Sequence, residues 1–203
     1  MYQYQLYTRI WHLLNALFFL ALIITGISMQ YSNPDSPFIS FGASVKIHNI
    51  SGIGLSFNYL IFFIGNWVTG NGKNYKIQWK GERERLMKQA HYYLSGYFKK
   101  DNPPFPITEE KKFNPLQALT YALALYIVVP ILIITGWGLL FPETILDRFV
   151  GLSGLVITDV LHVAAGFLLS VFMIIHIYIC TLGADPKGNF RSIITGWHNS
   201  DSH

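Results

Sequence analysis

Charged residues are scarce in this sequence, and cysteine is nearly absent. Asp, Glu, Lys and Arg make up 13% of the 203 residues, whereas hydrophobic residues make up 51%. The single cysteine, Cys180, excludes a disulfide framework, a four-cysteine iron–sulfur site and a C-x-x-C-H motif for covalent heme. Because Cys180 lies near the end of a long apolar stretch, we expect it to have a packing role.

Four long apolar stretches account for the low charge. Each reaches the roughly 20 residues that a helix needs to cross about 30 Å of hydrocarbon. They cover approximately residues 10–30, 47–68, 115–141 and 156–182. We do not expect the first to be a cleaved signal peptide, because Arg9 and a Trp-His pair open it and no small-residue cleavage site follows before Gln30. We expect an all-α membrane protein, a four-helix transmembrane bundle that forms a single domain over residues 1–203.

Basic residues are distributed unevenly among the connections. Ten of the 15 lie in the loop between the second and third stretches: Lys73, Lys76, Lys80, Arg83, Arg85, Lys88, Lys99, Lys100, Lys111 and Lys112. Three flank the ends of the chain (Arg9, Lys187 and Arg191), and two remain for the other loops (Lys46 and Arg148). Loops rich in Lys and Arg stay cytoplasmic. We therefore expect a bacterial inner-membrane protein with both termini and the long loop in the cytoplasm. The net charge of +4 follows from this topology, and no nucleic-acid partner is expected.

The long loop contains an amphipathic segment from Trp79 to Lys100. Its apolar residues recur at helical spacing opposite basic residues, and they are Leu86, Ala90, Tyr93, Leu94 and Tyr97. This pattern predicts a helix between the second and third spans that lies flat on the cytoplasmic surface. The string DNPPFP, from Asp101 to Pro106, then breaks the helix and returns the chain to the membrane.

Four of the seven histidines fall in the apolar stretches, where metal-binding or ionisable side chains are costly and therefore indicate function. His162 and His176 are 14 residues apart, so they project from one face of a helix about 21 Å apart. The predicted topology places His48 at the depth of His162 near the outer surface, and His12 at the depth of His176 near the inner surface. We expect structural or solvated roles for the other three, His91, His198 and His203.

Two pairs of neutral imidazoles are suitable axial ligands for the iron of two low-spin b hemes, whose filled coordination favours electron transfer over oxygen binding. Interhelical hydrogen bonding is the alternative for any single histidine, but it does not explain four that pair by depth. We therefore expect two non-covalent hemes, an outer one held by His48 and His162 and an inner one held by His12 and His176.

Four glycines lie near the outer histidine pair. Gly52 and Gly166 follow His48 and His162 by one turn in a shared H-x-x-x-G pattern, whereas the other two, Gly26 and Gly136, end the LIITG strings of the first and third stretches. We expect these glycines to admit a flat porphyrin. The alternative is that they only allow close helix packing. The repeated strings indicate either a duplicated hairpin or packing demands that the two hairpins share.

Nearly the whole chain resembles the cytochrome b subunits of respiratory formate dehydrogenase, nickel–iron hydrogenase and thiosulfate reductase. The resemblance rests on the opening RIWHLLNALFFLALIITG, on His48, on RLMKQAHYYL and KFNPLQALTY, and on the 14-residue histidine spacing. Members of that family are membrane anchors with a four-helix diheme core. The resemblance implies a quinone (menaquinone or ubiquinone) near the inner heme, and an iron–sulfur or cytochrome redox subunit at the outer face.

The resemblance also implies a quinone role for Asn114 and Gln117, beside His176. Their amide groups are suited to hydrogen-bond a quinone carbonyl. An ordinary helix start, with Asn114 as N-cap and Pro115 at the first helical position, explains the same residues without a ligand. Arg9 either pairs with a propionate of the inner heme or only anchors its helix at the inner surface.

Taken together, these features predict a diheme subunit that transfers electrons between the quinone pool and a periplasmic-side redox partner. The sequence shows no glycine-rich nucleotide loop, catalytic triad or pterin-binding domain, so we expect substrate chemistry on other subunits. One alternative is a stand-alone diheme cytochrome b that exchanges electrons between quinone and a small oxidant or reductant such as superoxide. A second alternative, a non-redox anchor or transporter, predicts that no Soret band is visible.

Overall fold

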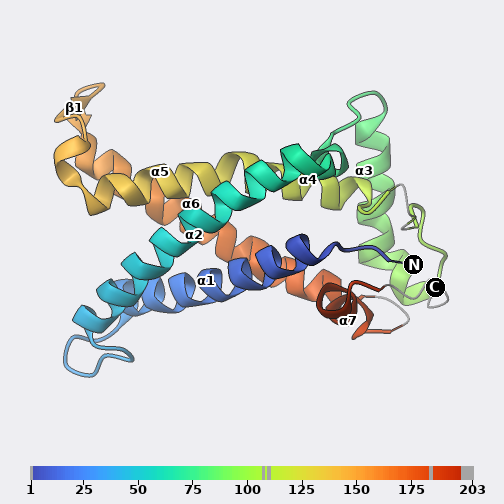
Figure 1. Cartoon of the computed structure of the whole chain (residues 1–203), viewed down its shortest axis with the longest axis horizontal. Helices are drawn as coiled ribbons and strands as arrows, with labels where there is room; N and C mark the ends of the chain where they lie inside the picture. Colours follow the sequence, from blue (N-terminus) through green and yellow to red (C-terminus); the bar gives the residue numbers. More distant parts are fainter. Residues whose placement is uncertain (1, 107, 109–110, 183–184, 198–203) are drawn as a thin grey trace. The chain divides into compact units, whose positions relative to one another are not determined.

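The structure is a computed structural model, which describes residues 2–106, 108, 111–182 and 185–197. It is mostly helical, and four of its helices are long and apolar enough to cross a membrane (Figure 1). They are α1 (Leu6–Tyr31), α2 (Phe41–Thr69), the third span Pro115–Leu140 and α6 (Gly154–Cys180). The prediction of an all-α membrane protein with four spans is confirmed, and the arrangement is consistent with a four-helix bundle.

Two helices begin at least four residues earlier than their apolar stretches. α1 begins at Leu6 rather than at residue 10, and α2 begins at Phe41 rather than at residue 47. Backbone hydrogen bonding continues past the edge of the apolar sequence, so hydropathy underestimates helix length. Lys46 consequently lies in an early turn of α2, where it is exposed and its long side chain is able to reach the polar interface.

The third span contains a turn of π-helix. It consists of α4 (Pro115–Leu123), the π turn η4 (Ala124–Val128) and α5 (Val129–Leu140). Pro130 lacks a backbone N–H, and its ring clashes with the carbonyl four residues earlier, at Tyr126. That carbonyl belongs to η4, so the wider turn lies where proline disturbs the helical hydrogen bonds.

The described chain forms two compact units, and each is considered by itself. Unit 1 comprises residues 1–9, 65–127 and 172–203, and unit 2 comprises residues 10–64 and 128–171. Unit 2 contains segments of all four spans, whereas unit 1 contains the chain ends and the long connection. That the whole chain is a single domain stays a prediction.

In unit 2, polar contacts link the spans in pairs. The Asn58 side-chain amide donates to the carbonyl of Trp11, which joins α2 to α1 at 3.2 Å. The Trp137 indole donates to the Ser56 hydroxyl at 3.0 Å, which joins α5 to α2. Many large apolar side chains of these helices are exposed, including Leu17 and Phe167. Such exposure is expected of a surface that lipid covers.

A short hairpin precedes α6. It pairs β1 (Arg148–Phe149) with β2 (Leu152–Ser153), and both residues of its two-residue turn have positive φ, 51° at Val150 and 80° at Gly151. This turn has the left-handed geometry that suits the twist of a two-stranded ribbon. The hairpin then enters α6 at Gly154, whose N–H donates to the carbonyl of Asp147.

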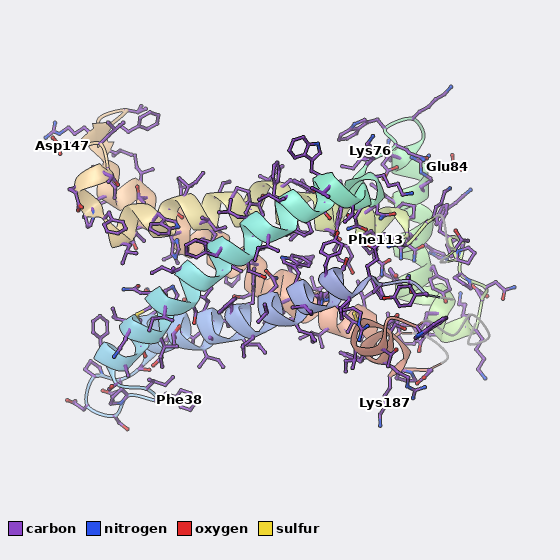
Figure 2. The ribbon with its side chains drawn as sticks, viewed as in Figure 1. Phe38, Lys76, Glu84, Phe113, Asp147 and Lys187 are labelled. Carbon is purple, nitrogen blue, oxygen red and sulfur yellow. The ribbon has the colours of Figure 1, made fainter. Side chains whose placement is uncertain are left out.

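In unit 1, the amphipathic segment forms three consecutive helical elements. They are α3 (Glu82–His91), the π turn η2 (Tyr92–Gly96) and the 3-10 turn η3 (Tyr97–Lys99), preceded by η1 (Asn71–Tyr75). α3 runs across the start of α4 (Figure 1). The prediction of a helix here is confirmed, and Leu94, which lies in the π turn, is 80% exposed. The labelled charged side chains of this unit, Lys76, Glu84 and Lys187, are also exposed (Figure 2).

The two ends of the chain pair with each other in unit 1. Tyr2 and Trp197 form an antiparallel bridge, and the N–H of Gln3 donates to the carbonyl of Gly196 at 2.8 Å. α7 (Gly188–Thr195) lies just before this bridge. The N-terminal and C-terminal segments therefore lie together, which agrees with an even number of spans.

Two glycine substitutions should change thermal stability in opposite directions. A Cβ at Gly154 would lie 1.9 Å from the carbonyl oxygen of Leu146, so backbone must move, whereas a Cβ at Gly42 on α2 meets nothing within 4 Å. Gly154→Ala should lower the melting temperature of the detergent-purified protein. Gly42→Ala should leave it unchanged or raise it, because alanine is favoured over glycine in a helix by about 1 kcal/mol. Equal melting temperatures for the two variants would contradict this packing.

Candidate functional site

Two histidines from different helices have neighbouring rings in an edge-to-face arrangement in unit 2. His48 of α2 and His162 of α6 have ring centres 6.2 Å apart and ring planes 65° apart. These are the two histidines that the sequence analysis paired as the outer site. Both residues are half-buried rather than enclosed.

Each ring is hydrogen-bonded to a threonine on a neighbouring helix. Thr25 Oγ1 lies 2.9 Å from Nδ1 of His48, and Thr135 Oγ1 lies 3.0 Å from Nδ1 of His162. Thr25 belongs to α1 and Thr135 to α5, so the site uses segments of all four spans. In both rings the nitrogen that contacts threonine is Nδ1, and Nε2 is the other ring nitrogen.

The pair has dimensions that suit one metal ion between two imidazoles. A metal–imidazole nitrogen bond is about 2 Å long and the ring centre lies about 1 Å behind the nitrogen, so two opposed ligands have ring centres roughly 6 Å apart. The observed 6.2 Å agrees with that value. Within the described part of the chain, no three His, Cys, Asp or Glu side chains gather into a metal site. Two imidazoles at this separation would suit the iron of a heme, whose porphyrin would supply the remaining ligands.

The predicted glycines differ in the space beside them. At Gly136 a Cβ would lie 3.1 Å from Cε1 of His162, and at Gly26 it would lie 3.6 Å from Cε1 of His48. At Gly52 and Gly166 the nearest atoms are leucine methyl groups at 4.0 and 3.8 Å. Gly136 in particular allows a close approach of the histidine ring. Room for a porphyrin beside these four glycines stays a prediction, as does the alternative of simple helix packing.

His176 of α6 lies among aromatic side chains in unit 1. Its Nδ1 is 3.2 Å from the Tyr121 hydroxyl, and its ring stacks on Phe172 with planes 16° apart. Cys180, one turn later, has its Sγ 3.9 Å from Nε2 of His176. Iron bound at Nε2 would replace that sulfur contact. As at His48 and His162, a side-chain oxygen lies beside Nδ1, but here it is the phenol oxygen of Tyr121 rather than a threonine hydroxyl.

His12 lies on α1 in unit 2. Its ring is edge-on to Trp11, which in turn stacks on Phe62 with ring centres 4.3 Å apart. The Trp11 indole nitrogen is buried and has no hydrogen-bond partner among the described residues, so a donor is available beside His12. Because His12 and His176 belong to different units, their pairing stays a prediction.

Of the three remaining histidines, one lies among the described residues. His91 is exposed on α3. His198 and His203 lie outside the described residues.

Asn114 and Gln117 form a reciprocal cap at the start of α4. Oδ1 of Asn114 accepts from the N–H of Gln117 at 3.0 Å, and Oε1 of Gln117 accepts from the N–H of Asn114 at 3.2 Å. Nδ2 of Asn114 donates to the Tyr93 hydroxyl at 2.7 Å, and burial raises the pKa of Tyr93. Both residues therefore have the structural role of a helix start. Their quinone role stays a prediction, and the Nε2 group of Gln117 takes part neither in this cap nor in the bond to Tyr93.

Arg9 joins the start of α1 to the C-terminal segment. Its guanidinium donates to the carbonyl of Ile194. Its Nε is buried without a hydrogen-bond partner among the described residues, so one donor is available for an anionic group such as a propionate. Both predicted roles, heme contact and anchor, stay open.

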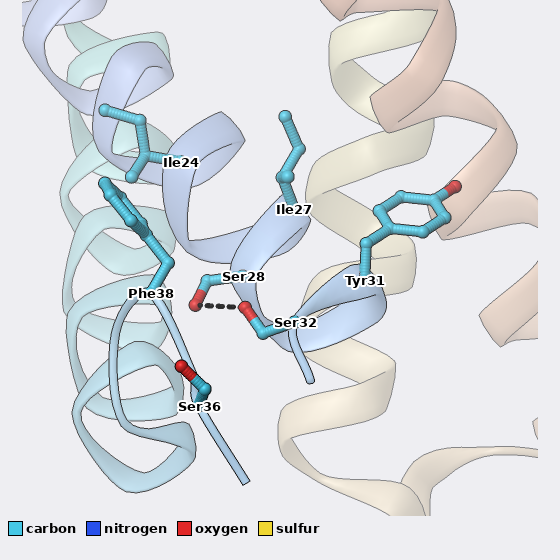
Figure 3. Close-up of a pocket in the computed structure, with 7 residues that line it drawn as sticks. All are labelled: Ile24, Ile27, Ser28, Tyr31, Ser32, Ser36 and Phe38. Atoms are coloured by element: carbon cyan, nitrogen blue, oxygen red, sulfur yellow. Dashed lines mark hydrogen bonds between the residues drawn. The ribbon is translucent and has the colours of Figure 1, made fainter. Parts of the chain in front are cut away.

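A groove of about 390 Å³ lies at the end of α1 and along the loop that follows it (Figure 3). Its lining residues are Ile24, Ile27, Ser28, Tyr31, Ser32, Ser36 and Phe38. The Ser28 and Ser32 hydroxyls are hydrogen-bonded to each other at 3.3 Å. None of the predicted heme or quinone residues lines this groove.

Sequence reasoning missed three residues that contact the histidines: Thr25, Thr135 and Tyr121. A signal for the first two was present, because each threonine occupies the same place in the two LIITG strings, directly before the glycine. The hydroxyl of a threonine in a transmembrane helix usually donates a hydrogen bond to a backbone carbonyl of the same helix. No pattern in the sequence shows that the ring of a histidine lies across from it.

Comparison with known proteins adds an independent observation. Residues 3–196 match the family model described as prokaryotic cytochrome b561. The chain is also 34% identical over 197 residues to the Escherichia coli (strain K12) protein "Putative cytochrome YdhU". The aligned segment covers 97% of this chain and 74% of that protein. No solved structure matches the chain.

Replacement of Asn114 should separate its capping role from its contact with Tyr93. Asn114→Ala should lower stability by about 1 kcal/mol because it removes the N-cap acceptor. Asn114→Ser keeps a capping oxygen and removes the amide donor to Tyr93, so it should retain most of that stability. Thermal unfolding of the purified variants measures both effects. If serine destabilises as much as alanine does, the bond to Tyr93 rather than the cap holds this helix start.

Proposed function

Because the chain belongs to the prokaryotic cytochrome b561 family, we propose that it is the diheme subunit of a respiratory oxidoreductase complex. Membership makes it a multi-pass membrane cytochrome b that binds heme b and transfers electrons. It also argues against the non-redox anchor or transporter. The proposal adds the number of hemes, the ligands, the quinone and the partner.

The observation that carries the proposal is the His48–His162 pair. Its ring separation fits two axial ligands of one iron, and each ring has an oxygen at Nδ1 that leaves Nε2 for the metal. These two histidines hold the outer heme. His12 and His176 hold the inner heme, which is supported by the aromatic setting and the Nδ1 contact of His176. When bound, the hemes supply one-electron transfer, and the chain supplies ligands and insulation.

Quinone (menaquinone or ubiquinone) exchanges electrons with the inner heme near Asn114, Gln117 and His176. Gln117 and Tyr121 are four residues apart on α4 and so lie on one helix face, and Tyr121 contacts His176. The Nε2 group of Gln117, outside the cap, is the donor for a quinone carbonyl. The other electron partner is an iron–sulfur or cytochrome subunit on the periplasmic side.

The chain lies in the bacterial inner membrane with both termini in the cytoplasm. Support comes from the basic residues, of which ten lie in the connection within unit 1, and from the paired chain ends in the same unit. The stand-alone reading, with superoxide or another small reactant in place of the partner subunit, shares the fold and the ligands. Purification from native membranes separates the two, since only the first yields a stoichiometric partner.

Two non-covalent b hemes per chain are the expected cofactor content. His48→Ala and His162→Ala should each remove the same heme and leave the other, and the remaining Soret band would show that the variant is folded. His12→Ala and His176→Ala should remove the other heme. Heme extraction and redox titration of each variant measure this. Loss of one common heme in His12→Ala and His48→Ala would show that the pairing is wrong.

Gln117→Leu should slow electron exchange with quinone analogues while both heme spectra stay unchanged. The variant removes the Nε2 donor but leaves the side chain similar in size. Gln30→Leu is the matched control, because it removes an amide near the other end of a span. Stopped-flow reduction or oxidation by a quinone analogue measures the rate. Equal rates in both variants would place the quinone elsewhere, and loss of the inner heme would give Gln117 a structural role.

A further inference from the structure

Thr25 and Thr135 contact the rings of His48 and His162, and the proposed heme ligation gives neither threonine a role. We infer that they are positioning residues, which hold His48 and His162 in one tautomer and aim Nε2 of each ring at the heme iron. This inference rests on the proposed outer heme. It goes beyond that proposal because it gives two residues on α1 and α5 a role: they determine the tautomer and orientation of the proposed ligands on α2 and α6.

The position of the hydroxyl proton follows from distances within each helix. Thr25 Oγ1 lies 2.6 Å from the carbonyl oxygen of Ala21, and Thr135 Oγ1 lies 2.7 Å from that of Ile131. Two oxygens so close repel unless a proton lies between them, and a carbonyl has none to give. The hydroxyl therefore donates to its own helix in both cases.

The tautomer of each histidine follows from the hydroxyl. A threonine hydroxyl has one proton, so once it donates to the carbonyl its oxygen is only an acceptor toward the ring. Nδ1 of His48, at 2.9 Å, and Nδ1 of His162, at 3.0 Å, must then carry the hydrogen. A neutral imidazole protonated at Nδ1 has its lone pair at Nε2, which is the form that binds a metal.

Burial strengthens this control. The exposed fraction is 1% for Thr25 and 8% for Thr135, so water does not compete for the hydroxyl. Chains of hydrogen bonds from ring to hydroxyl to carbonyl polarise one another, which makes the oxygen a better acceptor. The residue after Thr135, Gly136, allows the Cε1 side of the His162 ring to approach the helix closely, because a Cβ there would lie 3.1 Å from Cε1. At Gly26 the corresponding distance to Cε1 of His48 is 3.6 Å, which is an ordinary van der Waals contact.

Removal of the hydroxyl should raise the midpoint potential of the outer heme. An Nδ1–H bond increases electron density on the ring and so favours ferric over ferrous iron. Thr25→Val and Thr135→Val keep the side-chain shape and remove the acceptor, so each should shift that potential upward, with a larger shift in the double variant. Thr25→Ser and Thr135→Ser retain the hydroxyl and should restore the original potential.

The experiment is a redox titration of the purified full chain with both hemes, followed by ferric EPR spectra and heme extraction. Thr158→Val is the matched control, because Thr158 also donates to the carbonyl four residues earlier, that of Gly154, at 2.9 Å. It should leave both potentials unchanged. An upward shift or loss of the outer heme in the valine variants that serine reverses supports the inference.

Other results overturn it. Unchanged potentials and EPR spectra in both valine variants would show that the threonines do not control the ligands, and so would serine variants that behave like valine. Failure of the proposed heme site is recognised separately, because His48→Ala would then retain both hemes whatever the threonine variants do.

Discussion

Polar groups inside a membrane span must find partners within the protein, because hydrocarbon offers none. Thr25 and Thr135 satisfy this constraint for two histidines at once. Each hydroxyl donates to its own helix and accepts from a ring on the neighbouring one. The same bonds join α1 to α2 and α5 to α6, and they determine which ring nitrogen is available. Helix packing and the chemistry of the proposed ligands therefore depend on one set of contacts.

The repeated strings of the sequence correspond to repeated contacts. In both hairpins an LIITG threonine contacts the histidine of an H-x-x-x-G pattern, and the following glycine lies beside Cε1 of that ring. These matched roles explain why the strings recur whether the hairpins arose by duplication or by shared packing demands. His176 departs from the pattern, since a tyrosine phenol takes the place of the threonine.

In unit 1, the residues that begin α4 take part in more than one set of contacts. Asn114 and Gln117 cap α4, and Asn114 also joins that helix start to the amphipathic segment through Tyr93. The cap and the bond to Tyr93 engage the other side-chain amide atoms of these two residues. A quinone site there would therefore have to use the Nε2 group of Gln117. The basic loop, the paired chain ends and this cap all belong to one unit, so the proposed quinone site and the charges that predict the membrane orientation lie in the same unit.

The sequence by itself determined the four spans, the amphipathic helix and the relation to membrane b cytochromes, because hydropathy, periodicity and motif spacing are local properties. It also selected His48 and His162, since both fall in apolar helices at one predicted depth. Only the tertiary structure decided that their rings are neighbours and that threonines lie at Nδ1. It likewise decided that Asn114 and Gln117 cap each other and that Leu94 lies exposed in a π turn. Ring orientation and hydrogen-bond partners depend on side chains from other helices, which spacing along one helix does not specify.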